Sequence, residues 1–244
     1  MMSDRHFAAI YDVLMEDVPY HKWVDYCKKY IPNNSEVLDV ACGTGTFTIL
    51  LYKAGFTVSG IDIAEDMLTI AEEKVRDKQL PIPLFHQDMR SLSGFSQLDA
   101  VTLFCDGLNY LMDETDVQIT FTRIASALKS GGIFLFDVHS LSKIRNTFNE
   151  QLFGENREDI SYLWFCNHGS QTDSVDHSFT FFVKNEDGSY ERTDEEHSQR
   201  TFPIEEYVRW LQFVGFHNIE VSSNFGETSV IEADDRIFFK AEKK

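Results

Sequence analysis

The chain has 244 residues, and its 22 Lys and Arg against 40 Asp and Glu leave a formal net charge of −18. Hydrophobic residues make up 43% of the sequence. A chain of this length and composition can bury one sizeable core, so a single domain over residues 1–244 is expected. Nonspecific nucleic-acid binding needs Lys and Arg to neutralise phosphates, so this acidic chain is not expected to bind nucleic acid.

The cysteines and the N-terminal segment indicate the cellular compartment in which the protein is expected. Four cysteines are far apart and form no C-x-x-C pair, a pattern typical neither of a disulfide framework nor of a structural zinc site. The first residues carry charge from position 4, and no stretch approaches the roughly 20 apolar residues of a membrane span. We therefore expect a soluble, cytoplasmic protein without a membrane partner, present as a monomer or a homodimer.

The predicted elements begin with a helical preface over residues 1–34, in which a helix covers 20–30 and ends before Pro32. Between 36 and 140, short apolar runs alternate with segments of helical period, which indicates a Rossmann-like, mostly parallel α/β sheet. Strands are expected at 37–40, 57–63, 84–86, 100–104 and 133–138, and helices at 47–53, 66–78 and 115–129. The last helix is expected to end at Gly131-Gly132, where a positive φ is wanted.

Residues 141–200 have a different pattern. Segments 161–165 and 178–184 resemble strands, and 185–188 resembles a hairpin turn. We expect an antiparallel β insertion after the fifth strand, because the α/β pattern resumes at 201–244. There Pro203 and Gly215 bracket a helix, and strands are expected near 219–223 and 237–241.

The most informative run is 37–46, where a predicted strand leads directly into the turn Gly43-Thr44-Gly45 and then into a helix. Small residues let a backbone approach a ligand closely, and the N-terminus of the following helix points N–H groups at it. A tight strand-to-helix turn that binds nothing would also use glycine, so the turn alone leaves both interpretations open.

Acidic residues lie in or directly after the ends of four successive predicted strands. Asp39 lies in the first strand, Asp62 ends the second, Asp88 follows the third and Asp106 follows the fourth. In a nucleotide-binding fold, the acid after the second strand accepts hydrogen bonds from the hydroxyls of a ribose. Each acid alone could be a helix cap or a solvated loop residue, but their recurrence at one sheet edge indicates a binding site.

These residues resemble a known family. The run from Leu38 to Gly45, the segment Gln87-Asp88-Met89-Arg90 and the early pair Tyr11-Asp12 are similar to class I S-adenosylmethionine-dependent methyltransferases, in particular the small-molecule branch with glycine-type and amino-sugar N-methyltransferases. The resemblance implies a seven-stranded, mostly parallel sheet, a cofactor-binding half at 36–140, an insertion at 141–200 that covers the substrate and a C-terminal part, 201–244, that completes the sheet. Ala41 departs from the pattern, because the family motif has glycine there.

The resemblance also implies roles for individual residues. Asp39 would orient the turn and hold the methionine amino group, Asp62 would hold the ribose, and Asp88 would accept from the adenine amino group. The backbone carbonyls of Phe104 and Cys105 would face the methionine ammonium. The full set of cofactor-binding residues implied is Tyr11, Asp39, Ala41, Gly43, Gly45, Asp62, Ile63, Met67, Asp88, Met89, Phe104 and Cys105.

Methyl transfer from a sulfonium is an in-line displacement, in which the protein mainly positions the acceptor and excludes water. A group that removes a proton helps only where the acceptor is an amine. Tyr11, Tyr110 and His139 are candidates for a catalytic role, with Asp106 as a further possible base, and the catalytic residue itself is left open. A loop or capping role is the alternative for His139.

The insertion is expected to cover the substrate pocket. Its candidate pocket residues are Tyr162, Trp164, Phe165, His168, Phe179 and Phe181, and a small core of the hairpins is the alternative for the aromatic ones. His168, His177 and His197 lack metal-site spacing, so we expect them at the solvated surface and expect no metal.

Three other classes of protein are alternatives to this interpretation. A short-chain dehydrogenase would need a Tyr-x-x-x-Lys pair and a P-loop enzyme the G-x-x-x-x-G-K-[ST] run, and the sequence has neither. A cofactor sensor that keeps the fold without turnover is the remaining alternative. The sequence therefore predicts methyl transfer from S-adenosylmethionine to a small molecule, with an amine nitrogen as one candidate acceptor atom.

Overall fold

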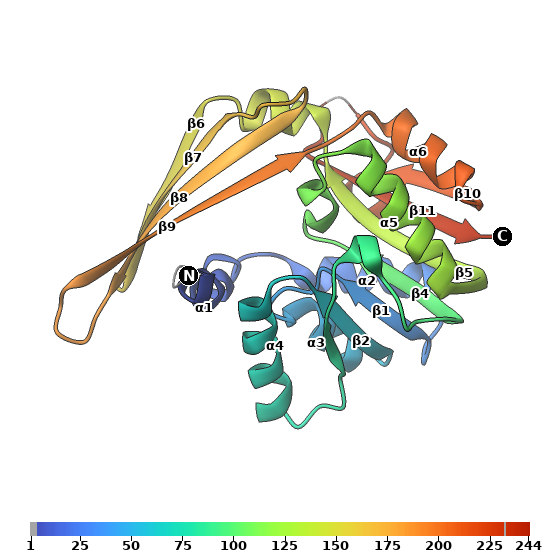
Figure 1. The fold of residues 1–244 in the computed structure, drawn as a ribbon, viewed down its shortest axis with the longest axis horizontal. Helices are drawn as coiled ribbons and strands as arrows, with labels where there is room; N and C mark the ends of the chain where they lie inside the picture. Colours follow the sequence, from blue (N-terminus) through green and yellow to red (C-terminus); the bar gives the residue numbers. More distant parts are fainter. Residues whose placement is uncertain (1–3, 232) are drawn as a thin grey trace.

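The computed structural model describes residues 4–231 and 233–244. Its centre is a seven-stranded sheet in the order β10-β11-β5-β4-β1-β2-β3 (Figure 1). Because β11 pairs antiparallel with both β10 and β5 while the other pairs are parallel, the remaining six strands share one direction. This confirms the predicted fold class. The strands are β1 (Glu36–Val40), β2 (Thr57–Asp62), β3 (Leu84–His86), β4 (Leu98–Leu103), β5 (Leu128–His139), β10 (Phe216–Ser222) and β11 (Arg236–Lys243).

Helices cover both faces of the sheet. Side chains of β5 alternate between them: Leu135 packs in one buried cluster with Trp23 of α2 and Leu51 of α3, whereas Phe134 belongs to the opposite cluster with Phe121 of α5. Within the described ranges, every helix is too short or too polar to cross a bilayer. The helices are α1 (Asp4–Leu14), α2 (Tyr20–Tyr30), α3 (Thr46–Lys53), α4 (Glu65–Asp77), α5 (Glu114–Ala127) and α6 (Ile204–Phe213).

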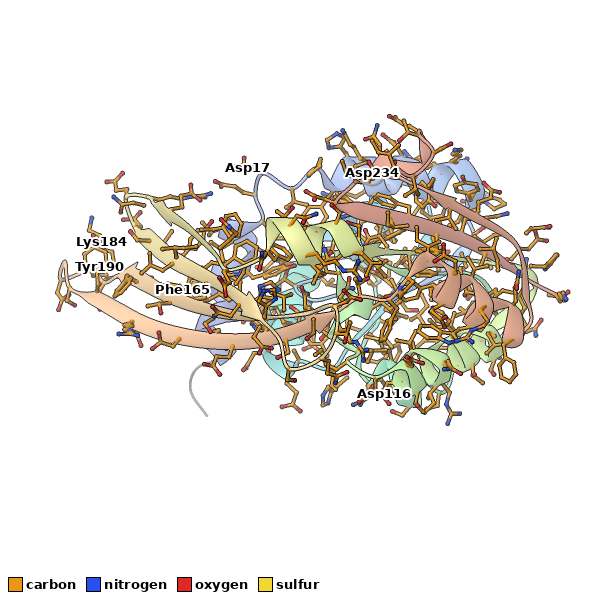
Figure 2. The ribbon with its side chains drawn as sticks, turned by 90° about the horizontal axis from the view of Figure 1, so that it is seen from above. Asp17, Asp116, Phe165, Lys184, Tyr190 and Asp234 are labelled. Atoms are coloured by element: carbon orange, nitrogen blue, oxygen red, sulfur yellow. The ribbon has the colours of Figure 1, made fainter. Side chains whose placement is uncertain are left out.

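The insertion forms a second sheet, an antiparallel meander in the order β6-β7-β8-β9. It projects from the central sheet over α1 (Figure 1), and Lys184 and Tyr190 mark its far tip (Figure 2). The predicted antiparallel insertion after the fifth strand is confirmed, although four strands are present where two were expected. They are β6 (Gln151–Asn156), β7 (Ile160–His168), β8 (Ser174–Lys184) and β9 (Tyr190–Arg200).

The junction of α5 and β5 differs from the prediction. The helix ends at Ala127, two residues early, because Leu128 has an extended backbone (φ −79°, ψ 148°) and pairs with Leu98 of β4. Gly131 adopts the expected positive φ, 75°, but inside the long strand β5. A tertiary pairing therefore ends this helix before its local stop signal.

Candidate active site

Three cavities meet at the carboxyl ends of β1, β2 and β4, and Ala41 lines all of them. The β3 cavity, of about 380 Å³, extends toward Asp88. The turn cavity, of about 50 Å³, lies between Tyr11 and Phe104. The β9 cavity, of about 320 Å³, reaches His197 of the insertion. Because they share lining residues, the three cavities form one cleft at the sheet edge where ligands of this fold class bind.

The glycine turn has a left-handed backbone at each of its key positions: φ is 56° at Ala41, 54° at Gly43 and 73° at Gly45. A Cβ added at Gly43 would meet nothing within 4 Å, so the space beside it is open to a ligand. A Cβ at Gly45 would lie 3.0 Å from the Cβ of Ala71. Gly43 therefore opens the cleft, and Gly45 lets α3 and α4 pack closely.

Asp62 fastens this turn to the end of β2. One carboxylate oxygen, Oδ2, accepts a hydrogen bond from Gly43 N at 2.7 Å, and Oδ1 accepts one from Ala64 N at 2.8 Å. Burial raises the pKa of Asp62 above its usual value, against the lowering effect of these backbone donors. The side chain lines both larger cavities, and its oxygens retain lone pairs that ligand hydroxyls can use.

Asp39 lies beneath the turn, 2% exposed, and lines the turn cavity. Its two carboxylate oxygens accept hydrogen bonds from Thr48 Oγ1 at 2.6 Å and Thr102 Oγ1 at 2.9 Å. Burial raises the pKa of Asp39 to about 7, although the two hydroxyls lower it. This carboxyl group therefore supports the turn from below and is poised to take up a nearby positive charge.

The β3 cavity has a polar wall and an apolar wall. Asp88 forms an ion pair with Arg90, with Oδ2 at 2.6 Å from Nη2. The hydrogen bonds that Arg90 donates to this carboxylate lower the pKa of Asp88. Met89 and Ile63 line the same cavity, and Ile63 is 57% exposed. Met67, on α4, lines the neighbouring β9 cavity.

The chain after β4 turns through two consecutive left-handed residues, Cys105 at φ 54° and Asp106 at φ 69°. Such a backbone costs a residue with a Cβ more than it costs glycine. Phe104 and Cys105 line the turn cavity. Asp106 instead pairs with Arg236, with Oδ1 at 2.6 Å from Nη1. Burial alone would raise the pKa of Asp106, but Arg236 and His139 hold it below its usual value, so Asp106 is a weak base.

Helix α1 closes the cleft from the N-terminal side. Tyr11 lines both the turn cavity and the β9 cavity, and burial raises its pKa well above the usual value. The next residue, Asp12, accepts hydrogen bonds from Thr44 Oγ1 at 2.7 Å and Thr46 Oγ1 at 3.1 Å and pairs with Lys74 of α4. Asp12 therefore ties α1 directly to the glycine turn.

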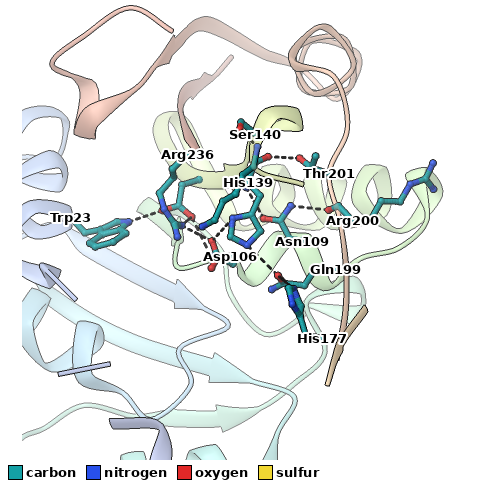
Figure 3. A network of polar contacts seen from close by, with 12 residues as sticks. Trp23, Asp106, Asn109, His139, Ser140, His177, Gln199, Arg200, Thr201 and Arg236 are labelled. Atoms are coloured by element: carbon teal, nitrogen blue, oxygen red, sulfur yellow. Dashed lines mark hydrogen bonds and ion pairs between the residues drawn. The ribbon is translucent and has the colours of Figure 1, made fainter. Parts of the chain in front are cut away.

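His139 belongs to a buried polar network that joins the insertion to the central sheet (Figure 3). Its Nδ1 lies 3.4 Å from Asp106 Oδ1, and its Nε2 lies 3.1 Å from Gln199 Oε1. The same Gln199 oxygen lies 3.2 Å from His177 Nε2. Burial lowers the pKa of His139 to about 3 and that of His177 to about 4, so both are neutral at pH 7, and the contacts favour a structural role for His139.

The acceptor side of the cleft contains two residues that the sequence analysis did not select, Glu195 and His197. Both lie on β9, whose odd-numbered residues from 193 to 199 are buried or half-buried and whose even-numbered ones are exposed from 190 to 198. Gln199 is on the same face and fixes its position through the network in Figure 3. The missed signal was a period-two pattern made of polar residues, TDEEHSQ, in place of apolar ones.

Several expectations for the insertion are wrong. Phe165 is 40% exposed and lies in β7 between the inward-facing positions Trp164 and Cys166 (Figure 2), so it faces away from the cleft, and His168 is exposed. His177 and His197 were expected at the solvated surface, but His177 is 4% exposed and His197 is half-buried and lines the β9 cavity. The other aromatic candidates pack in small clusters with α1 and with the segment after β5: Tyr162, Trp164, Phe179 and Phe181.

The chemistry of this cleft fits S-adenosylmethionine. The open side of Gly43 accepts a close ligand, the buried carboxylate of Asp62 suits a ribose diol, and the apolar surface of Ile63 and Met89 suits a planar base. Acidic Asp39 at the turn cavity suits a positively charged amino group. The candidate residues are therefore brought together, except that Gly45, Asp106 and His139 line none of the three cavities.

Comparisons with known proteins agree. A family model described as a methyltransferase domain matches residues 37–132. YqeM of Bacillus subtilis (strain 168), which bears a provisional methyltransferase name, is 45% identical over 99% of this chain and 98% of its own. The glycine/sarcosine N-methyltransferase of Aphanothece halophytica is 30% identical over 83% of this chain and 73% of its own.

A solved structure extends the comparison to three dimensions. The S-adenosylmethionine-dependent methyltransferase of Clostridium acetobutylicum ATCC 824 aligns with a TM-score of 0.87 and 30% identity over 98% of each chain. Sheet order, cleft and relatives together define a class I methyltransferase. This chain belongs to the S-adenosylmethionine-dependent methyltransferase family, and S-adenosylmethionine is its methyl donor.

Proposed function

We propose that this methyltransferase acts in the cytoplasm, as a monomer or a homodimer, on a nitrogen atom of a small-molecule acceptor. The observation that carries the proposal is the β9 cavity. It continues from the glycine turn, has a volume of about 320 Å³ and is covered by α1 and β9. A cavity of this size is typical of small-molecule sites, which supports a small-molecule acceptor over a nucleic acid or a lipid bilayer.

The cofactor would lie along the three cavities. Asp62 would hold the ribose, Met89 and Ile63 would contact the adenine, and Asp88 would accept from its amino group. The methionine part would lie in the turn cavity, near Asp39 and the carbonyls of the turn after β4. When bound, the cofactor supplies an electrophilic methyl group and its own leaving group, so the protein needs to position the acceptor and exclude water.

Two further observations support a nitrogen acceptor. The Aphanothece halophytica relative is by its name an N-methyltransferase. The protein carries a net charge of −18, which favours a neutral or cationic acceptor over a polyanionic one. An amine, unlike a carboxylate, gives up a proton during methylation, and the cavity contains the imidazole of His197 and the phenol groups of Tyr11 and Tyr110.

The proposal is tested by incubating the protein with methyl-labelled S-adenosylmethionine and a panel of primary amines, amino sugars, carboxylates and phenols, followed by mass spectrometry. Label is expected on nitrogen in at least one amine. Label confined to carboxylates or phenols would contradict the proposal.

A further inference from the structure

We propose that Glu195 and His197 of β9 form the acceptor subsite, in which Glu195 binds a cationic or hydroxyl-bearing part of an amine acceptor that has no carboxylate and His197 takes the proton from its nitrogen. This inference rests on the proposed nitrogen acceptor and specifies its chemistry. Neither residue lies in the part of the chain that the methyltransferase domain model matches, which ends at residue 132.

The geometry of β9 directs both side chains into the cleft. Residues 195, 197 and 199 lie on one face of the strand because successive side chains alternate. Gln199 is held between His139 and His177, which fixes the register of this face against the central sheet. His197 and Glu195, which lie two and four residues before Gln199, line the β9 cavity. Glu195 is only 9% exposed.

His197 is also positioned by its ring neighbours. The ring of Tyr110 lies edge-on to it with centroids 6.0 Å apart, and the ring of Phe179 lies at the same distance. Across the sheet its partner is His177. The other titratable residues that line its cavity are Tyr11, Asp62, Glu65, Asp66, Cys105, Tyr110 and Glu195.

The charges in this cavity separate amine acceptors into two classes. Four of its lining residues are acidic, Asp62, Glu65, Asp66 and Glu195, and none of those described is Lys or Arg. An acceptor with a carboxylate, such as glycine, would bring its negative charge into this wall without a cation to pair with, which is strongly unfavourable in a partly buried site. An amine that carries hydroxyl groups in place of the carboxylate has no such penalty.

The proposed step is balanced without another reactant. The acceptor ammonium transfers a proton to His197, and the nitrogen lone pair then forms the N–C bond as the S–C bond breaks. The sulfur retains the bonding electron pair, which converts the sulfonium into a neutral thioether, and the positive charge moves to the methylated nitrogen. Solvent then takes the proton from His197 as product leaves.

The test compares 2-aminoethanol and glucosamine with glycine and sarcosine as acceptors, using purified full-length protein. Variants are Glu195→Gln and His197→Gln, and Glu196→Gln, which removes the same charge from the exposed face of β9, is the matched control. We expect the two hydroxyl-bearing amines to be methylated with kcat/KM at least about tenfold above glycine and sarcosine. E195Q should raise the acceptor KM by about tenfold or more, and H197Q should lower kcat by about a hundredfold.

Calorimetric titration with S-adenosylhomocysteine gives a second readout. Both variants should bind it as the unaltered protein does, because the proposed subsite holds the acceptor. Equal effects of E195Q and E196Q on KM, preferred methylation of glycine, or loss of S-adenosylhomocysteine binding in E195Q would overturn this inference. Methyl transfer to no amine in the wider panel, with S-adenosylhomocysteine still bound, would instead contradict the proposed function.

Discussion

Ala41 shows how one side chain can occupy a position that favours glycine. Its φ of 56° is left-handed, a conformation that costs a residue with a Cβ about 1–2 kcal/mol. The methyl group packs against the turn after β4, since a Cβ added at Gly107 would lie 2.8 Å from it. The departure from the family motif is therefore accommodated by a glycine on the facing turn.

Ala41→Gly is expected to stabilise the protein by about 0.5–1 kcal/mol, because glycine adopts positive φ without strain. Urea unfolding measures this difference. Ala54→Gly is the control: Ala54 has an ordinary φ of −77°, so the same change there should destabilise by about 0.5 kcal/mol. A loss of stability in A41G would contradict the strain assigned to this residue.

At the residue scale, the sequence predicted the cofactor side of the cleft better than the acceptor side. Asp39 and Asp62 lie at the ends of strands with clear apolar patterns and Asp88 follows the next strand, so the sheet order of the fold places them at one edge. Glu195 could not be found in the same way, because its strand carries polar residues on both faces.

Among the elements around the cleft, α1 is held to the glycine turn through the side chain of Asp12. Asp12 accepts hydrogen bonds from the hydroxyls of Thr44 and Thr46 and forms an ion pair with Lys74. It therefore joins α1 to the glycine turn and to α4. The helix also packs on the insertion through Ile10. No local pattern predicts such contacts, because they link residues 32 or more positions apart.

Asp12→Ala should release α1 and weaken S-adenosylhomocysteine binding by about 1–2 kcal/mol, the scale for hydrogen bonds to a charged group. Calorimetry measures the affinity, and Asp17→Ala, at an exposed position shown in Figure 2, is the control. If the two variants bind equally well, Asp12 does not hold the cleft closed.

The insertion illustrates how tertiary contacts override local signals. Its existence followed from the change of pattern at 141–200, and the hairpin turn at 185–188 follows β8 as predicted. The outer strands β6 and β9 were missed, since β9 has only one apolar or aromatic residue, Tyr190. Antiparallel pairing along the whole of β8 holds β9 in a strand conformation that its own sequence pattern does not predict.

At the scale of the whole molecule, two neutral histidines join the insertion to the central sheet (Figure 3). Their folded-state pKa values, about 3 for His139 and about 4 for His177, lie below the unfolded value of about 6.5. The unfolded chain therefore binds protons that the folded protein does not. The stability from these histidines is fully present above about pH 6.5 and is lost as the pH falls toward their folded pKa values. Asp39 has the opposite effect on the pH dependence of stability, because its folded-state pKa is raised to about 7.

The substitution His177→Gln separates the effect of this histidine on the pH dependence of stability from the effect of Asp39. The stability of the unaltered protein relative to H177Q should fall by about 2 kcal/mol between pH 8 and pH 5, since a shift of one pKa unit corresponds to about 1.4 kcal/mol. Urea unfolding of both proteins at the two pH values measures the difference. A difference that does not change with pH would show that His177 titrates normally in the folded protein.

The net charge of −18 also concerns the whole molecule. It argues against nucleic-acid binding, and residues 141–200 contribute −6 of it through 12 acidic and 6 basic residues. Most of that charge is solvated, but Glu195 is buried in the cleft. Acidic residues at the surface favour solubility, whereas the carboxylate of Glu195 is proposed to select the acceptor.

We propose that S-adenosylmethionine lies at the carboxyl ends of the first strands, with its ribose on Asp62. Calorimetric titration of the unaltered protein and of Asp62→Ala with S-adenosylmethionine tests it most directly. We expect the unaltered protein to bind it and Asp62→Ala to weaken the binding by about 2 kcal/mol or more, the cost of removing hydrogen bonds to a charged group. Unchanged affinity in that variant would contradict the ribose assignment.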